Sequence, residues 1–90
     1  MEREAVMKGI SSKMKLIRVE QGYNQAEMAM ILGISKKTLV QIEKERITAN
    51  WTTIVTTCVL FRESEIIQNV IGANVLAVFD DFLARQKKQA

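Results

Sequence analysis

The side chains that could do chemistry in this 90-residue chain are hydrogen-bond donors and cations rather than nucleophiles or metal ligands. The chain has no histidine, and its only cysteine is Cys58. Metal sites built from Cys and His, Ser-His-Asp triads and Cys-His pairs are therefore excluded within one chain. The carboxylates of Asp80 and Asp81 are adjacent and would point to different faces of a helix. The residues predict a protein that is not an enzyme and that needs no metal or cofactor.

The donors gather in residues 24–43, where the pattern predicts two short helices joined by a glycine turn. Asn24 and Ser35 are typical N-terminal caps, and Glu27 completes a capping-box pair with Asn24. Gly33 supplies the turn, because glycine adopts a positive φ at little cost. The second helix would keep one apolar face and turn a polar, cationic face to solvent. That is the layout of a helix-turn-helix, whose second helix enters the major groove of DNA.

Basic residues are unevenly distributed along the chain. Residues 1–48 contain nine cations and six acids, a net charge of +3, whereas residues 49–90 contain four of each, a net charge of 0. The whole positive surplus therefore lies in the half that holds the helix-turn-helix pattern. This placement favours a polyanionic partner more strongly than the small total charge does.

Apolar residues recur at helical spacing through the chain, and no segment alternates with period two. Val6, Ile10, Met14 and Ile17 predict one first helix that ends near Gln21. Further helices are expected to begin at capping residues, namely Asn24, Ser35, Asn50, Ser64 and Asn74. The sequence thus predicts an all-α fold of four core helices plus two C-terminal helices. Residues 1–61 would form the helix-turn-helix core, and residues 62–90 a helical extension of the same domain.

The chain shows no pattern of export or membrane insertion. Its first four residues lack a signal-peptide pattern, and we expect no apolar run to approach the roughly 20 residues that span a bilayer. A helix lying on a membrane surface at residues 74–88 is disfavoured by Asp80 and Asp81, because such helices usually carry a cationic polar face. The absence of a disulfide framework suits a reducing compartment. We therefore expect a cytoplasmic protein without a membrane partner.

Many of these residues stand at the fixed spacing of a known family. The matching positions are Arg18, Gln25, Met28, Ala29, Leu32, Gly33, Ile34, Ser35, Thr38, Leu39, Ile42 and Glu43, followed by the apolar helix after Asn50. Over about residues 10–61 the sequence resembles the Cro and phage-repressor type of helix-turn-helix, often called Xre-like. The resemblance implies a lambda-repressor-like fold and sequence-specific binding of double-stranded DNA.

The resemblance also implies roles for single residues. In such proteins the glutamine that opens the second helix binds a phosphate, a role that falls to Gln25. Exposed residues of the third helix read bases, and Lys36, Lys37 and Gln41 stand at those positions. Lysine suits guanine O6 and N7, and glutamine can pair with adenine N6 and N7. The alternative for both lysines is a solvated face or contact with phosphate alone. Ser35 is expected to cap the third helix and to contact phosphate.

Val40 and the loop that follows complete the candidate interface. Val40 is expected to point outward with Gln41, where it would either pack on a thymine methyl group or stand as a lone exposed valine. Lys44, Arg46 and Thr48 are further candidates for contact with DNA, and the last two can reach phosphates from the loop.

The resemblance implies a structural ion pair between Arg18 and Glu43, which would fix the third helix against the first. Two departures from the family pattern concern the loop after the third helix. The family often has glycine where this chain has Glu45, and proline where it has Ala49. A non-glycine residue near Glu45 or Arg46 is therefore expected to have a strained backbone.

The C-terminal extension is more apolar than the core motif requires. The residues expected at a homodimer interface are Val75, Phe79, Phe82 and Leu83. The alternative is that they pack on their own core, with Phe79 over Met30 and Ile31. Leu16, Met30 and Ile31 are also apolar where the family has polar residues, which predicts a second buried surface, covered either by the C-terminal helices or by another chain.

Together these features predict a homodimeric transcriptional regulator, a repressor, that binds a palindromic operator. The alternative is an antitoxin-like or other protein-interaction module that binds a protein partner through its C-terminal helices.

Overall fold

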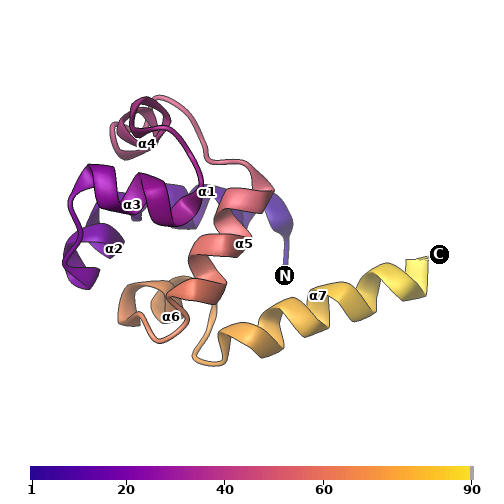
Figure 1. Cartoon of the computed structure of the whole chain (residues 1–90). Helices are drawn as coiled ribbons and strands as arrows, with labels where there is room; N and C mark the ends of the chain where they lie inside the picture. Colours follow the sequence, from indigo (N-terminus) through magenta and orange to yellow (C-terminus); the bar gives the residue numbers. More distant parts are fainter. Residues whose placement is uncertain (90) are drawn as a thin grey trace.

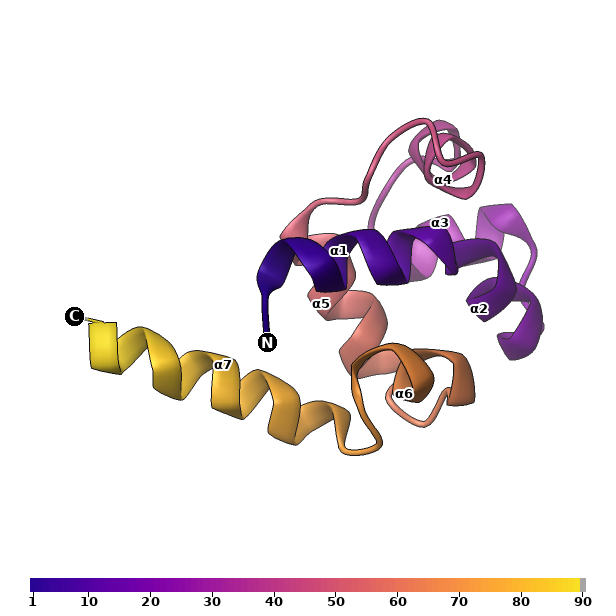
Figure 2. The same ribbon diagram turned by 180° about the vertical axis from the view of Figure 1, so that it is seen from behind.

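Seven α-helices make up most of residues 1–89, which are the residues that the computed structural model describes (Figures 1 and 2). They are α1 (Arg3–Ser12), α2 (Met14–Gln21), α3 (Gln25–Leu32), α4 (Lys36–Glu43), α5 (Trp51–Leu60), α6 (Glu65–Ile71) and α7 (Val75–Gln89). No β-strand occurs in this part of the chain. The prediction of an all-α fold is confirmed.

One predicted helix is in fact two, because the chain bends at Lys13 between α1 and α2. The Ser12 hydroxyl donates to the Gly9 carbonyl at 2.8 Å, the acceptor that the Lys13 N–H would use in a continuous helix. The Lys13 N–H donates instead to the Ile10 carbonyl, one residue closer. The apolar spacing continues across the bend, which is why it predicted a single helix.

The predicted caps set the starts of the other core helices. The side chains of Asn24, Ser35, Asn50 and Ser64 each accept a hydrogen bond from the backbone N–H three residues later, at 2.8, 3.0, 2.9 and 3.2 Å. Each bond satisfies an N–H group that a helix start leaves unpaired. The capping box between Asn24 and Glu27 is complete.

The hydrophobic core lies where α1 packs against α4, α5 and α6. Its fully buried side chains come from six helices and include Ile10, Met14, Ile17, Met28, Leu39, Ile42, Ile54, Cys58 and Ile67. Because Ile67 belongs to α6, the core extends beyond the helix-turn-helix into the C-terminal extension. The core holds α3 and α4 against the rest of the molecule.

Helix α7 leaves the core after its first turns and projects from it (Figures 1 and 2). Val75 was expected at a dimer interface, but its side chain is only 2% exposed in the chain's own core. This part of the prediction is wrong, because Val75 immediately follows the turn that brings α7 back onto the core. Phe79 packs on Trp51, with ring centroids 5.9 Å apart, rather than over Met30.

The second buried surface predicted at the outer apolar positions is not formed within the chain. Leu16 is 53% exposed and Met30 is 80% exposed. Ile31 is half-buried against the core. Helix α7 cannot cover Leu16 or Met30, because it packs against α5 and α6.

The segment Glu65–Lys87 is long and apolar enough to cross a membrane by length and composition alone, so the expectation that no apolar run approaches that length is wrong. The structure divides this segment into α6 and α7, with Gly72 between them at φ 118°. A membrane-spanning segment must satisfy its backbone hydrogen bonds without interruption. The break at Gly72 therefore argues against a spanning helix.

Candidate nucleic-acid interface

Helices α3 and α4 form the predicted helix-turn-helix, joined by a turn of three residues. Gly33 ends α3 in the left-handed conformation at φ 70°, which glycine adopts without the steric cost of a Cβ. The N–H of Ile34 then donates to the Ala29 carbonyl at 3.0 Å and closes the end of α3. Leu39 and Ile42 are buried, as predicted. The turn therefore seats the apolar face of α4 in the core and leaves its opposite face in solvent.

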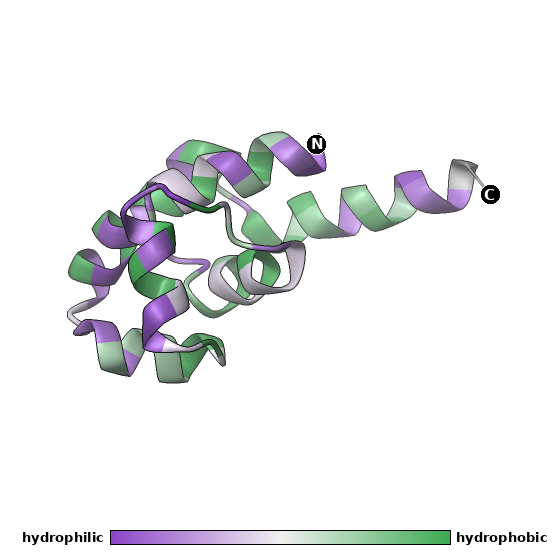
Figure 3. Cartoon of the chain, turned by 90° about the horizontal axis from the view of Figure 1, so that it is seen from above, coloured by the Kyte–Doolittle hydropathy of each residue, from purple (hydrophilic) through white to green (hydrophobic). Residues whose placement is uncertain are grey.

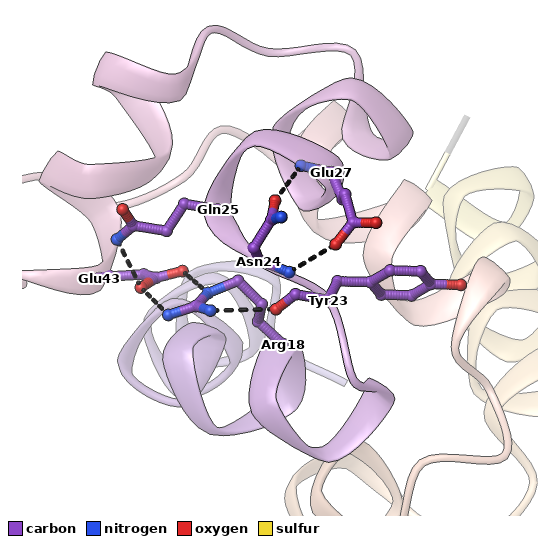
Figure 4. A network of polar contacts seen from close by, with 6 residues as sticks. All are labelled: Arg18, Tyr23, Asn24, Gln25, Glu27 and Glu43. Carbon is purple, nitrogen blue, oxygen red and sulfur yellow. Dashed lines mark hydrogen bonds and ion pairs between the residues drawn. The ribbon is translucent and has the colours of Figure 1, made fainter.

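Arg18 and Glu43 form the ion pair that the resemblance implied (Figure 4). Arg18 Nε donates to Glu43 Oε2 at 2.7 Å, and Arg18 Nη2 donates to Glu43 Oε1 at 3.0 Å. Arg18 Nη1 also donates to the Tyr23 carbonyl at 3.0 Å. The Glu43 side chain is 4% exposed and the Arg18 side chain 13% exposed. This pair ties the C-terminal end of α4 to α2.

The same carboxylate positions Gln25, the first residue of α3 (Figure 4). Gln25 Nε2 donates to Glu43 Oε1 at 3.2 Å. An amide NH2 group has two hydrogens, so the second one stays available for another acceptor. The hydrogen bond with Glu43, stronger than the cost of burial that opposes it, raises the pKa of Arg18 and keeps its guanidinium charged. Three helices thus converge on one carboxylate.

The predicted reading face of α4 lies at the molecular surface. Lys36 and Lys37 are exposed, and Val40 and Gln41 are partly exposed. Ser35 caps the helix and also donates its hydroxyl hydrogen to Thr38 Oγ1 at 2.9 Å. The first turn of α4 therefore presents two cations and an N-terminal dipole, a combination that attracts phosphate and base-edge acceptors.

The loop after α4 begins with a strained residue, as predicted. Glu45 has φ 58°, and no other non-glycine residue among those described has a positive φ. The N–H of Arg46 donates to the Gln41 carbonyl at 3.0 Å, which closes the end of α4 in the way a glycine usually allows. Lys44, Arg46 and Thr48 are exposed around this turn. The loop keeps the shape typical of a glycine turn, at the cost of strain at Glu45.

The sequence analysis missed the residue that anchors this loop. The Ala49 N–H donates to the Ser11 Oγ at 2.9 Å, in a buried contact between the loop and α1. A proline at position 49 would have no N–H to donate. The only signal in the sequence was a serine directly after Ile10 on the buried side of α1. The pairing itself depends on two residues that are 38 positions apart.

The lone cysteine, Cys58, is buried in the core. Burial raises the pKa of the Cys58 thiol to about 12, so the thiol remains protonated and unreactive at neutral pH. Among residues 1–89, no three His, Cys, Asp or Glu side chains lie close enough to hold a metal ion. The polar side chains at the surface of α4 instead suit recognition through hydrogen bonds and charge.

Comparison with known proteins agrees with this geometry. Residues 14–53 match the helix-turn-helix family, a span that runs from the start of α2 to the first turn of α5. This family is DNA-binding and non-enzymatic. No curated protein and no solved structure matches the chain. Residues 14–53 therefore form a helix-turn-helix domain of the Cro and phage-repressor, or Xre-like, type, which implies DNA binding and transcriptional regulation.

Proposed function

We propose that the protein is a repressor that binds a palindromic operator as a homodimer and reads bases with α4. The observation that carries this proposal is the network of Arg18, Glu43 and Gln25. It holds the end of α4 and the start of α3 in one rigid unit, so that reading and phosphate-binding side chains keep a constant separation. A rigid recognition surface loses little conformational entropy on binding.

Within this proposal the contacts divide into two kinds. Lys36, Lys37 and Gln41 face the major groove, and Val40 packs on a thymine methyl group beside them. The residues proposed to contact phosphates are Gln25, Ser35, Lys44, Arg46 and Thr48. The available NH2 hydrogen of Gln25 supports this division, because a phosphate oxygen is a suitable acceptor for it.

Dimerisation through α7 is supported by the exposure of its apolar side chains. Leu76, in the first turn of α7, is 46% exposed, and Leu83, further along the helix, is 62% exposed. Figure 3 shows green, apolar residues along this projecting helix. A single DNA-binding module buries only about 600–1,000 Å² on DNA, so a second copy would supply the affinity that one module lacks. The interface then consists of Leu83 and Leu76 with the edges of Phe79 and Phe82.

Selection of bound duplexes from a random DNA pool tests the proposal. We expect a palindromic consensus whose half-sites are centred about one helical turn, roughly 34 Å, apart. Replacement of Gln41 by Ala should weaken the free energy of binding to the selected site by about 1–3 kcal/mol and relax the base preference at one position. Replacement of Gln25 by Ala should weaken binding to all sequences about equally, because a phosphate contact carries no base information. If Gln41→Ala changes neither affinity nor base preference, α4 does not read the bases.

Replacement of Leu83 by Asp tests the dimer separately, because Leu83 is an exposed residue of α7 and not part of the helix-turn-helix. We expect this variant to remain folded, to become monomeric in light scattering and to bind a half-site weakly. A wild-type chain that is itself monomeric, and that co-purifies with a second polypeptide, would favour a module that binds a different protein through α7. Action on operators would place the protein in the cytoplasm, which stays a prediction.

A further inference from the structure

An aromatic cluster joins the start of α5 to the middle of α7. The ring of Trp51 lies 5.9 Å from the ring of Phe79 and 5.3 Å from the ring of Phe82, measured between centroids. Both pairs are tilted, with interplanar angles of 55°. Such offset aromatic contacts are favourable beyond the area that they bury. Trp51 is thus the contact by which α5 holds the middle of α7.

Helix α7 depends on this contact for its direction. Its first point of attachment is next to the turn, where Val75 is buried and Val78 is partly buried. The turn itself contains Gly72 at φ 118°, and glycine can adopt many other conformations at little cost, so the residue type alone does not fix the direction of α7. The second point of attachment is the pair Phe79 and Phe82 on Trp51. Every side chain from residue 83 to residue 87 is exposed, so none of these five side chains holds the helix against the rest of the chain.

Trp51 is also firmly connected to the part of the molecule that reads DNA. It is the first residue of α5, which the preceding Asn50 caps through the Thr53 N–H at 2.9 Å. The residue before the cap, Ala49, is held by Ser11. Ala49 ends the loop that begins after α4. The buried hydrogen bond between Ala49 and Ser11 therefore ties the loop in front of Trp51 to α1, whereas the aromatic contact holds the middle of α7 to Trp51.

We propose that Trp51 sets the angle between α7 and α4, and that it thereby determines the half-site spacing which the dimer accepts. This inference rests on the proposed dimer through α7. A helix of 15 residues is about 22 Å long, so a tilt of about 10° moves its far end by about 4 Å. The rise per base pair is about 3.4 Å. A small change of angle at Trp51 is therefore enough to move the far end of α7 by about the rise of one base pair.

The test compares the wild type with Trp51→Ala, Trp51→Leu and Trp51→Phe on a series of operators. Each operator has the selected half-sites, with the spacer shortened or lengthened one base pair at a time. We expect the wild type and Trp51→Phe to bind the operator of one spacing with about tenfold or more higher affinity than the others. This difference is in line with the loss of affinity caused by a mismatched base pair. For Trp51→Ala and for Trp51→Leu, the affinities for operators of different spacing should lie within about threefold of one another. The base preference in each half-site should be unchanged.

Leu60→Ala is the matched control, because Leu60 is an exposed apolar residue of the same helix outside the cluster. It should keep the wild-type spacing preference. Light scattering, performed before DNA is added, separates the two proposals. A monomeric wild type would overturn the dimer and this inference together. A dimeric Trp51→Ala or Trp51→Leu variant with the wild-type spacing preference would overturn this inference alone.

Trp51 is the only tryptophan, so its fluorescence gives a second measurement on the unaltered protein. Binding to an operator with a displaced half-site should tilt α7 and open the aromatic cluster. We expect the Trp51 emission to shift to longer wavelength on that operator and to stay unchanged on the preferred one. Identical emission on both operators, with both half-sites occupied, would contradict the proposal even if the Trp51 variants do not fold.

Discussion

Arg18 and Glu43 are joined by two hydrogen bonds, of 2.7 and 3.0 Å, that link α2 to α4 across 25 positions of sequence. The Glu43 carboxylate is almost fully buried, and it also accepts a hydrogen bond from Gln25. One carboxylate therefore orients both helices of the helix-turn-helix. Loss of either charge would leave the other in a poorly solvated position.

Replacement of Arg18 by Met should lower the free energy of unfolding by about 3 kcal/mol. This is the lower end of the range for a broken buried pair, because part of the Arg18 side chain remains in water. Urea unfolding measures the change. The matched control is Asp81→Asn, which removes the exposed ion pair between Asp81 and Arg85 and should cost less than about 0.5 kcal/mol. Equal effects of the two substitutions would contradict the structural role of Arg18.

Replacement of Glu45 by Gly should raise the free energy of unfolding by about 1 kcal/mol relative to replacement by Ala. Both substitutions remove the carboxylate, but only glycine removes the steric cost of a Cβ at φ 58°. Thermal or urea unfolding of the two variants separates the free-energy cost of the strained backbone from the effect of losing the carboxylate. A glycine variant no more stable than the alanine variant would show that the left-handed conformation at this position is not strained.

Replacement of Gly9 by Ala should destabilise the protein, although alanine favours helix by about 1 kcal/mol over glycine. A Cβ at position 9 would lie 2.9 Å from Cγ1 of Val70, which brings α1 and α6 too close together. Valine in a helix has essentially one rotamer, so it cannot turn away. In a Val70→Ala background the same Gly9→Ala substitution should become stabilising. A double-mutant cycle by urea unfolding measures this reversal of sign, and its absence would refute the close contact.

Glu20 should make the protein sensitive to acid. Burial by itself would raise the pKa of Glu20, but hydrogen bonds from Ser64, Gln21 and the N–H groups of Ile66 and Glu65 outweigh it and lower that pKa below 4.5. Because the pKa is lower in the folded state than in the unfolded chain, the stabilisation is present above pH 4.5. It is lost as the pH falls through the folded-state pKa.

Replacement of Glu20 by Gln should therefore reduce stability at neutral pH and make it less dependent on pH below 4.5. Unfolding by urea at a series of pH values measures both effects. The control is Glu63→Gln, which removes an equal charge from an exposed position near the start of α6. If Glu20→Gln keeps the full acid dependence of the wild type, the contact with Ser64 does not contribute to it.

The sequence by itself determined the helical class, the caps and the position of the helix-turn-helix. These features depend on local rules: Asn24 and Ser35 bond to N–H groups three residues away, and Gly33 needs no partner to adopt its turn. The strain near Glu45 was predictable from the resemblance, since the family often has glycine at that position. The ion pair between Arg18 and Glu43 was predictable only because the spacing of the motif resembles a known family.

Only the tertiary structure decided how distant segments meet. The break at Lys13 depends on the competition of one hydroxyl for a backbone carbonyl, which apolar spacing does not reveal. The contact of Ala49 with Ser11, and that of Trp51 with Phe79 and Phe82, join residues whose own neighbours in sequence give no sign of the pairing. An amphipathic helix such as α7 can turn its apolar face to its own core, to a second chain or to both. The choice depends on the direction in which the chain leaves Gly72, and packing at Val75 and Trp51 sets that direction.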